Sequence, residues 1–156
     1  MIFSCKSTPA PAVEIPQTEE IVLQEETEEP EFSEELYLTT MDEVRSFIEE
    51  LNKIISARNY NAWVQMLSPE YFTEISSSAF LAGISERLPG NIVLRTARDY
   101  FDRIVVPSRR TSQLDDIEFL DRDRVIAFSY SMRGEELRRE ILFNLIKIDN
   151  QWKIVN

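Results

Sequence analysis

"IAFSYSMRGEELRREILFNLIKIDNQWKIVN" (residues 126–156) decides the fold class, because apolar and polar side chains alternate along it. Two strands carry apolar residues at every second position, each set on one face: Ile126, Phe128, Tyr130 and Met132, then Ile141, Phe143 and Leu145. Trp152 and Ile154 mark a short last strand. The turn-forming sequences Arg133-Gly134-Glu135 and Asp149-Asn150 separate these strands. With the alternation of Ile117 and Phe119 upstream, the pattern predicts a four-strand antiparallel meander.

Upstream of Pro107 the apolar residues recur with the helical period. Thr40, with Glu43 three residues later, has the pattern of a capping box and predicts a helix over about 41–58. A short helix around Trp63 follows, and Ser68-Pro69 predicts the start of a third. Further helices are expected to end at Pro89-Gly90 and at Pro107. The sequence therefore predicts an α+β fold, with helices packed on one face of the sheet.

The negative charge is concentrated near the N-terminus. Residues 1–40 hold ten acidic side chains and one basic side chain, a net charge of −9, out of −11 for the whole chain. Pro9, Pro11, Pro16 and Pro30 interrupt this stretch. Because like charges repel and prolines stiffen the backbone, we expect residues 6–38 to be a disordered acidic tether and 39–156 to be the folded domain.

The composition argues against several classes of function. The chain has no histidine and one cysteine, which removes the commonest general base and metal ligand and any intrachain disulfide. Residues 41–156 are nearly neutral, so no basic face for nucleic acid is expected. The acidic residues at 115–123 lack the spacing of a calcium loop, and no glycine-rich phosphate motif occurs. We therefore expect no metal, cofactor or nucleic-acid site.

Two quoted stretches resemble the NTF2-like (SnoaL-like) superfamily. "LIKIDNQWKIVN" (145–156) is similar to its closing hairpin, and "ISARNYNAWVQMLSPEYF" (55–72) to its opening helix pair. The resemblance implies that the helices close a curved sheet into a cone with an interior that binds or transforms a small molecule. Enzymes of this superfamily often use a histidine or an Asp/Tyr set, and this chain has no histidine.

The start of the chain resembles a bacterial lipobox. "IFSC" places an apolar Ile2 and a small Ser4 before Cys5. The resemblance implies that Cys5 is diacylated and that residues 1–5 are the remnant of a signal, whose charged and apolar parts are expected either upstream of Met1 or removed. The implied location is the bacterial cell envelope, on its periplasmic or surface face, with the protein attached to the membrane through Cys5.

The mouth of the expected cone is placed at the loop 107–112. There Arg109 and Arg110 are positioned to bind an acidic head group, while three aromatic residues are expected to line the interior: Tyr100, Phe128 and Tyr130. The ligand expected is a small apolar or amphiphilic molecule, and the alternative occupant is an envelope protein.

Two other interpretations remain open. Asp116 with Tyr130, or Asp99 with Tyr100, would suit an isomerase or dehydratase that moves protons. A module without a ligand would act only through protein contacts, for example as a homodimer joined through the sheet face. The arginines at 109 and 110 would then be ordinary loop charges that pair with Asp115 and Asp116.

Overall fold

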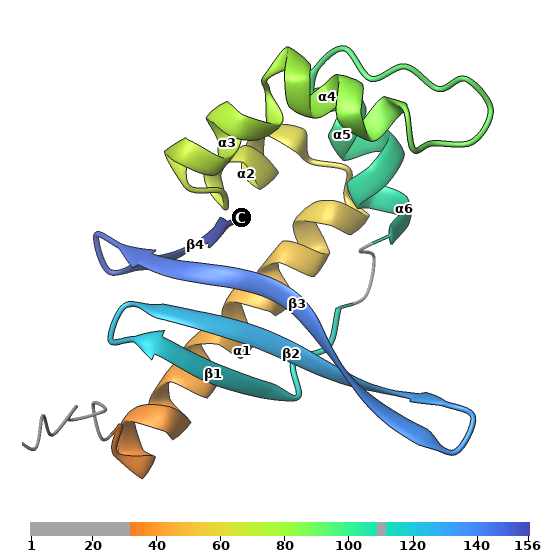
Figure 1. The fold of residues 1–156 in the computed structure, drawn as a ribbon. Coiled ribbons are helices and arrows are strands. Elements are labelled where there is room, and N and C mark those ends of the chain that lie inside the picture. Colours follow the sequence, from red (N-terminus) through yellow and green to blue (C-terminus); the bar gives the residue numbers. More distant parts are fainter. Residues whose placement is uncertain (1–31, 109–111) are drawn as a thin grey trace, which may run out of the picture.

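The chain folds into helices followed by a sheet, as the α+β prediction states. The computed structural model describes residues 32–108 and 112–156 (Figure 1). The elements in chain order are α1 (Glu34–Ser56), α2 (Tyr60–Gln65), α3 (Pro69–Ile75), α4 (Ser78–Ser85), α5 (Ala97–Tyr100), the π-helical turn η1 (Phe101–Val105), α6 (Val106–Ser108), β1 (Asp116–Asp121), β2 (Arg124–Arg133), β3 (Glu136–Ile148) and β4 (Gln151–Val155). Of the expected tether 6–38, residues 6–31 lie outside the described residues.

Helix α1 begins earlier than predicted. Its N-cap is Ser33, whose side chain accepts a hydrogen bond from the backbone amide of Leu36, and Glu34 and Glu35 occupy the first turn. Acidic residues there are favoured by the helix dipole. The expectation of a capping box at Thr40 and of a disordered stretch reaching residue 38 is therefore wrong: Thr40 is buried inside the helix, and Glu43 instead contacts the sheet.

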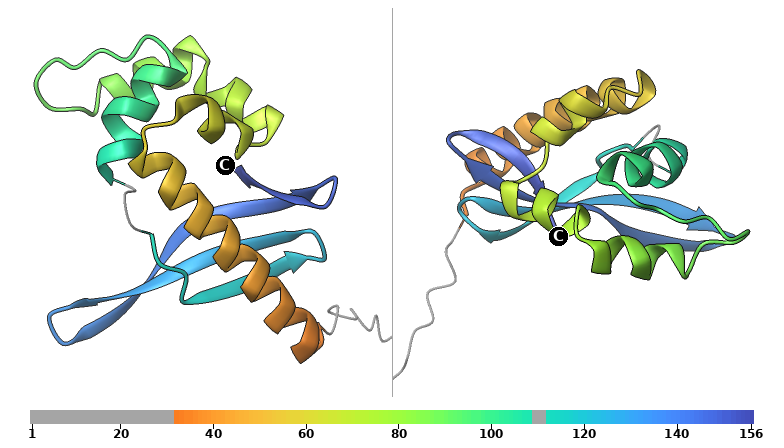
Figure 2. Two further views of the ribbon diagram at one scale, coloured as in Figure 1. Left: turned by 180° about the vertical axis from the view of Figure 1, so that it is seen from behind. Right: turned by 90° about the horizontal axis from the view of Figure 1, so that it is seen from above.

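The short helices α2 to α6 form a cap at one end of the sheet (Figures 1 and 2). Ser68 caps α3 with Pro69 in its first turn, as predicted. Helix α4 ends at Ser85 and not at Pro89, and the Ser85 hydroxyl accepts a hydrogen bond from the Leu94 amide nine residues later. The predicted last helix is a composite: it widens to a π-helical turn and continues through Pro107 into α6.

The sheet is an antiparallel meander in the order β1-β2-β3-β4, which confirms the predicted topology. Asp149 and Asn150 both have positive φ angles, 50° and 61°, as a tight two-residue turn between β3 and β4 requires. A β-bulge interrupts the β2–β3 register: Ala127 pairs with Phe143, but Phe128 pairs with Ile141. Ile141 therefore does not share a face with Phe143 and Leu145, contrary to the simple alternation, because the bulge inserts one extra residue.

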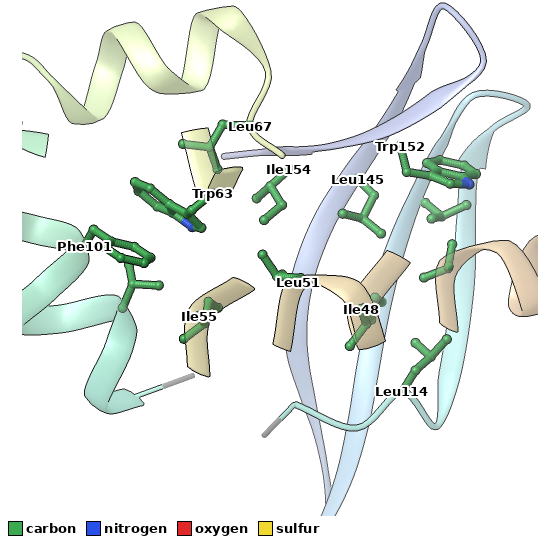
Figure 3. Packing of buried hydrophobic residues seen from close by; sticks show 14 of the residues in the cluster. Ile48, Leu51, Ile55, Trp63, Leu67, Phe101, Leu114, Leu145, Trp152 and Ile154 are labelled. Carbon is green, nitrogen blue, oxygen red and sulfur yellow. The ribbon is translucent and has the colours of Figure 1, made fainter. Parts of the chain in front are cut away.

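The core lies between α1 and one face of the sheet. The apolar stripe of α1 is fully buried, from Val44 through Ile48 and Leu51 to Ile55, and it faces Val125, Ala127, Leu145 and Ile154. Figure 3 shows Trp63 and Phe101 at the cap end of this core and Trp152 at the other end. The rings of Trp63 and Phe101 have centroids 4.9 Å apart. Burying both tryptophans joins the cap and the last strand to α1.

One polar clasp crosses this interface. The Glu43 carboxylate in α1 accepts hydrogen bonds from Lys147 Nζ at 2.7 Å and from Trp152 Nε1 at 3.0 Å. Lys147 and Trp152 are paired neighbours on β3 and β4. The clasp thus satisfies the indole N–H of a tryptophan that is only 8% exposed and fixes how α1 crosses the sheet.

Replacing Trp152 with alanine should lower the free energy of unfolding by about 3–5 kcal/mol, the usual cost of removing a buried aromatic side chain. Chemical denaturation monitored by circular dichroism measures this. Trp152→Phe is the control, since it keeps much of the ring packing and should lose less. Equal stability of the alanine variant and the parent would contradict the observed packing of β4.

Candidate functional site

A cavity opens where the helical cap meets the sheet; we call it the apolar cavity because most of its lining residues are apolar, although Asn144 and Asn156 add polar groups. It has a volume of about 210 Å³. Its walls come from α1, α2, α5 and the bulged part of β3, with residues that include Leu51, Ile55, Trp63, Tyr100 and Leu142. Strand β4 pairs with β3 only as far as Asn144, so Val155 and Asn156 form the floor beside the bulge. Figure 3 shows Leu51, Ile55, Trp63 and Ile154 pointing toward one another here.

A larger polar cavity adjoins the first along β3. Its volume is about 620 Å³, and Ile141 and Leu142 line both cavities. The remaining lining is largely polar: Ser108, Ser112, Gln113, Asp115, Ser129, Tyr130 and Glu140. Two of its carboxylates already have partners, because Asp115 accepts from the Tyr130 amide and Glu140 accepts from the Ser131 hydroxyl.

The predicted cone-lining residues do not converge on one cavity. Tyr100 lines the apolar cavity, packed edge-on against Phe80 with centroids 5.4 Å apart. Tyr130 lines the polar cavity. Phe128 lines neither of these two cavities, since the Arg139 guanidinium lies 3.4 Å from its ring centroid and helps to leave it 6% exposed. The sequence could not show this, because the covering arginine comes from the next strand.

Arg109 and Arg110 lie outside the described residues, and their role stays a prediction. The residues on either side of this gap, Ser108 and Ser112, both line the polar cavity. The loop expected at the mouth therefore begins and ends at that cavity. The expected partners of these arginines have other contacts: Asp116 pairs with Arg139 at 3.1 Å.

The Asp116–Tyr130 pair is formed, within a wider network. Asp116 accepts hydrogen bonds from Tyr130 at 3.1 Å, from Tyr37 at 2.9 Å and from Arg139, which also pairs with Glu118. Partial burial alone would raise the pKa of Asp116, but these hydrogen bonds outweigh it and hold the pKa below its ordinary value. A carboxylate so satisfied is a weak base, which does not favour proton abstraction by this pair.

Asp99 is committed to the backbone. Its carboxylate accepts from the amides of Arg95 at 2.9 Å and Thr96 at 3.1 Å and so completes the capping box of α5. These bonds, with that from Arg95 foremost, lower the pKa of Asp99. Its sequence neighbour Tyr100 lies in the aromatic packing near Trp63, so the structure gives this pair no shared chemistry.

Several cavity residues were missed as site residues from the sequence. The sequence placed Trp63 only in a short helix, and neither Leu142 nor Asn144 was predicted as a site residue, yet all three line the apolar cavity. One signal could have indicated the cavity: β3 has thirteen residues and β4 has five, so part of β3 has no β4 neighbour. Space beside an unpaired part of a strand can become part of a cavity. Within 32–108 and 112–156, no cluster of three or more potential metal-ligating side chains is present.

Comparison with known proteins supports the lipoprotein prediction. Over 120 residues the chain is 32% identical to an "Uncharacterized lipoprotein" of Treponema pallidum (strain Nichols). The matched stretch covers 76% of this chain and 62% of that protein. The chain thus spans less than two thirds of its relative's length. No protein-family model matches the chain, and no solved structure matches it. The NTF2-like resemblance therefore stays an expectation.

No helix in the described part of the chain combines the length and apolarity that crossing a bilayer requires. The 23-residue α1 is amphipathic, with charged residues along the face opposite its buried stripe. Lipid attachment at Cys5, which lies outside the described residues, stays a prediction that the similarity to a lipoprotein supports.

Acid should weaken the Glu43 clasp. The hydrogen bond from Lys147, opposed by partial burial and aided by Trp152, holds the pKa of Glu43 below its ordinary 4.5. A lowered folded-state pKa gives stability that is complete above the unfolded-state value and is lost as the pH falls through the folded-state pKa. Glu43→Gln should therefore melt lower at pH 7 and lose less on acidification to about pH 3 than the parent. Thermal melts across this range check it, with Glu49→Gln as the exposed control; equal losses in parent and Glu43→Gln would contradict it.

Proposed function

We propose that this protein is a lipoprotein of the bacterial cell envelope that holds a ligand-binding domain at a membrane through Cys5. Its domain binds a small apolar or amphiphilic molecule in the cavity beside the β3 bulge. The anchor rests on "IFSC" and on the lipoprotein relative. The binding activity rests on the paired apolar and polar cavities.

The proposed anchor needs no spanning helix. Two acyl chains on Cys5 would contribute roughly 0.8 kcal/mol for each buried CH₂, which is enough for stable attachment. Residues 6–31 between the anchor and the described domain can span at most roughly 90 Å when fully extended. That reach, together with the acidic composition of the stretch, suits a spacer that keeps the domain off an anionic lipid surface.

The cavity pair is the observation that carries the ligand proposal. Pockets for small molecules are mostly apolar and contain a few polar groups that orient the ligand. Here the apolar part, between Trp63 and Tyr100, is of a size for a short hydrocarbon or ring, and the polar part begins at Ile141 and Leu142. A molecule with an apolar end and a polar head matches this order. An acidic head would need Arg109 and Arg110 to bind it, because Asp115 and Glu140 in the lining accept hydrogen bonds from neutral donors, the Tyr130 amide and the Ser131 hydroxyl, and keep their negative charge.

Binding is favoured over catalysis by the state of the carboxylates. Asp116 and Asp99, the two candidate acid–base residues, both have lowered pKa values, and each accepts at least two hydrogen bonds. A general base is most effective when its pKa lies near the working pH. The chain has no histidine that could act as the base in place of Asp116 or Asp99.

The anchor prediction is tested by phase partitioning. Expressed behind a lipoprotein signal peptide in a bacterium that processes lipoproteins, the protein should enter the detergent phase. Cys5→Ala should move it to the aqueous phase, because the thiol that carries the lipid is gone, whereas Ser7→Ala should not. An unmutated protein that stays in the aqueous phase would rule the anchor out.

The ligand prediction is tested with dodecanoate as probe. In a Trp152→Phe background the fluorescence of Trp63 should change on titration, because Trp63 lines the apolar cavity. Val155→Phe fills that cavity and should abolish the change, while Val93→Phe, at a residue that is 60% exposed, should leave it intact. Arg109→Glu with Arg110→Glu should weaken binding only if the acidic head is recognised at the loop. No fluorescence change in the parent, with no co-purifying molecule in native mass spectrometry, would refute the proposal.

A further inference from the structure

The β2–β3 hairpin extends past the rest of the sheet. Strand β1 reaches β2 only as far as Phe128, and β4 reaches β3 only as far as Asn144. Beyond these points residues 129–141, which we call the arm, are two-stranded, and Figures 1 and 2 show the arm projecting away from the helices. Along residues 136–141, β2 is the one strand of the described chain that pairs with β3.

The arm has one apolar face. Tyr130 pairs with Arg139 and Met132 with Leu137, so these residues and Ile141 alternate onto the same side. Met132 and Leu137 are each 63% exposed, Ile141 is 56% exposed and Tyr130 is 42% exposed. A two-stranded ribbon is marginally stable in water by itself. An arm with an open edge and an open apolar face therefore gains stability from a further strand.

The edge of the arm is complementary to itself. When two copies of β3 run antiparallel with Arg139 opposite its own counterpart, Leu137 faces Ile141 of the second copy on the apolar side. On the other side, Arg138 faces Glu140 of the second copy. Each of these pairs occurs twice because the arrangement is two-fold symmetric.

Neighbouring registers are worse. A shift that places Arg138 opposite itself sets Glu136 against Glu140, and the opposite shift sets Glu140 against itself and Arg139 against Ile141. Registers of odd offset place residues of the apolar face against residues of the polar face. In the favoured register the facing Arg139 side chains are each already paired with Asp116 and Glu118 of their own chain, which offsets their repulsion.

We propose that two copies of this chain associate edge to edge through β3, with Leu137 opposite Ile141 and Arg138 opposite Glu140, so that their sheets join into one. This interface differs from a packing of sheet faces. It also sets the second copy beside Ile141, which lines both cavities, so the dimer and the ligand site share a border.

Charge reversal tests the pairing, in the full chain with Cys5→Ser. Sedimentation velocity should show a concentration-dependent dimer for the parent. Arg138→Glu or Glu140→Arg alone should weaken the dimer by about tenfold or more, because each sets like charges opposite one another twice. The double variant Arg138→Glu with Glu140→Arg should restore it. A parent that stays monomeric up to about 1 mM, or single variants that dimerise as the parent does, would overturn the proposal.

Disulfide trapping tests the register. In the Cys5→Ser background, Leu137→Cys and Ile141→Cys proteins are mixed and oxidised. The mixed disulfide should dominate, because facing residues lie within the roughly 7 Å that a disulfide spans, whereas two copies of residue 137 would be separated by about 13 Å. Circular dichroism confirms that each variant is folded. Predominant self-linked products from either variant, or no linkage at all, would contradict this register.

Discussion

The burial of the α1 stripe against one face of the sheet is the contact on which the rest of the structure depends. Val44, Ile48, Leu51 and Ile55 are almost completely removed from water, and each buried aliphatic side chain contributes about 1.5–3 kcal/mol. One helix covers only a limited length of sheet, however. Strands β1 and β4 have six and five residues, while β2 and β3 have ten and thirteen and continue beyond them (Figure 1). The arm arises where β2 and β3 run past that cover, whereas the apolar cavity lies under it, between α1, the cap and the bulged part of β3.

The β3 bulge at residue 142 has two structural consequences. It shifts Ile141 onto the face of Phe128 and Tyr130, and so completes the apolar face of the arm. It also lies close to Asn144, where the pairing of β3 with β4 ends, and its extra residue Leu142 lines the cavity that Trp63 and Tyr100 border. A single inserted residue thus places an exposed apolar edge and a partly enclosed apolar cavity side by side. Bulges near strand ends commonly redirect side chains in this way.

The sequence contained enough information for the helices, the strand order and the turns, because these depend on local periodicity, caps and φ-positive turn residues. It did not predict what depends on pairing between distant segments. Alternation cannot show that Leu142 is an extra residue, that Arg139 covers Phe128, or that Glu43 serves Trp152 and not a helix cap. The start of α1 was misplaced for a related reason: Ser33 and Thr40 are both acceptable caps, and the hydrogen bond from Tyr37 to Asp116 adds a tertiary contact to the earlier start. Tyr100 and Tyr130, expected together in one interior, each line a different cavity, and their part in ligand binding stays a prediction.

The N-terminal stretch that holds the proposed anchor and the arm of the domain differ in their net charge. Nine of the eleven net negative charges lie in residues 1–40, while the arm carries arginines and glutamates in matched pairs. A strongly acidic stretch is repelled by anionic lipids, whereas a charge-balanced edge is not repelled by its own copy. If lipid at Cys5 holds two copies on one membrane, as we propose, their domains would meet at a raised effective concentration, and a weak edge contact would gain most there. Attachment through Cys5 and pairing through β3 would therefore reinforce each other, and the cavity beside Ile141 would lie at the junction between the two copies.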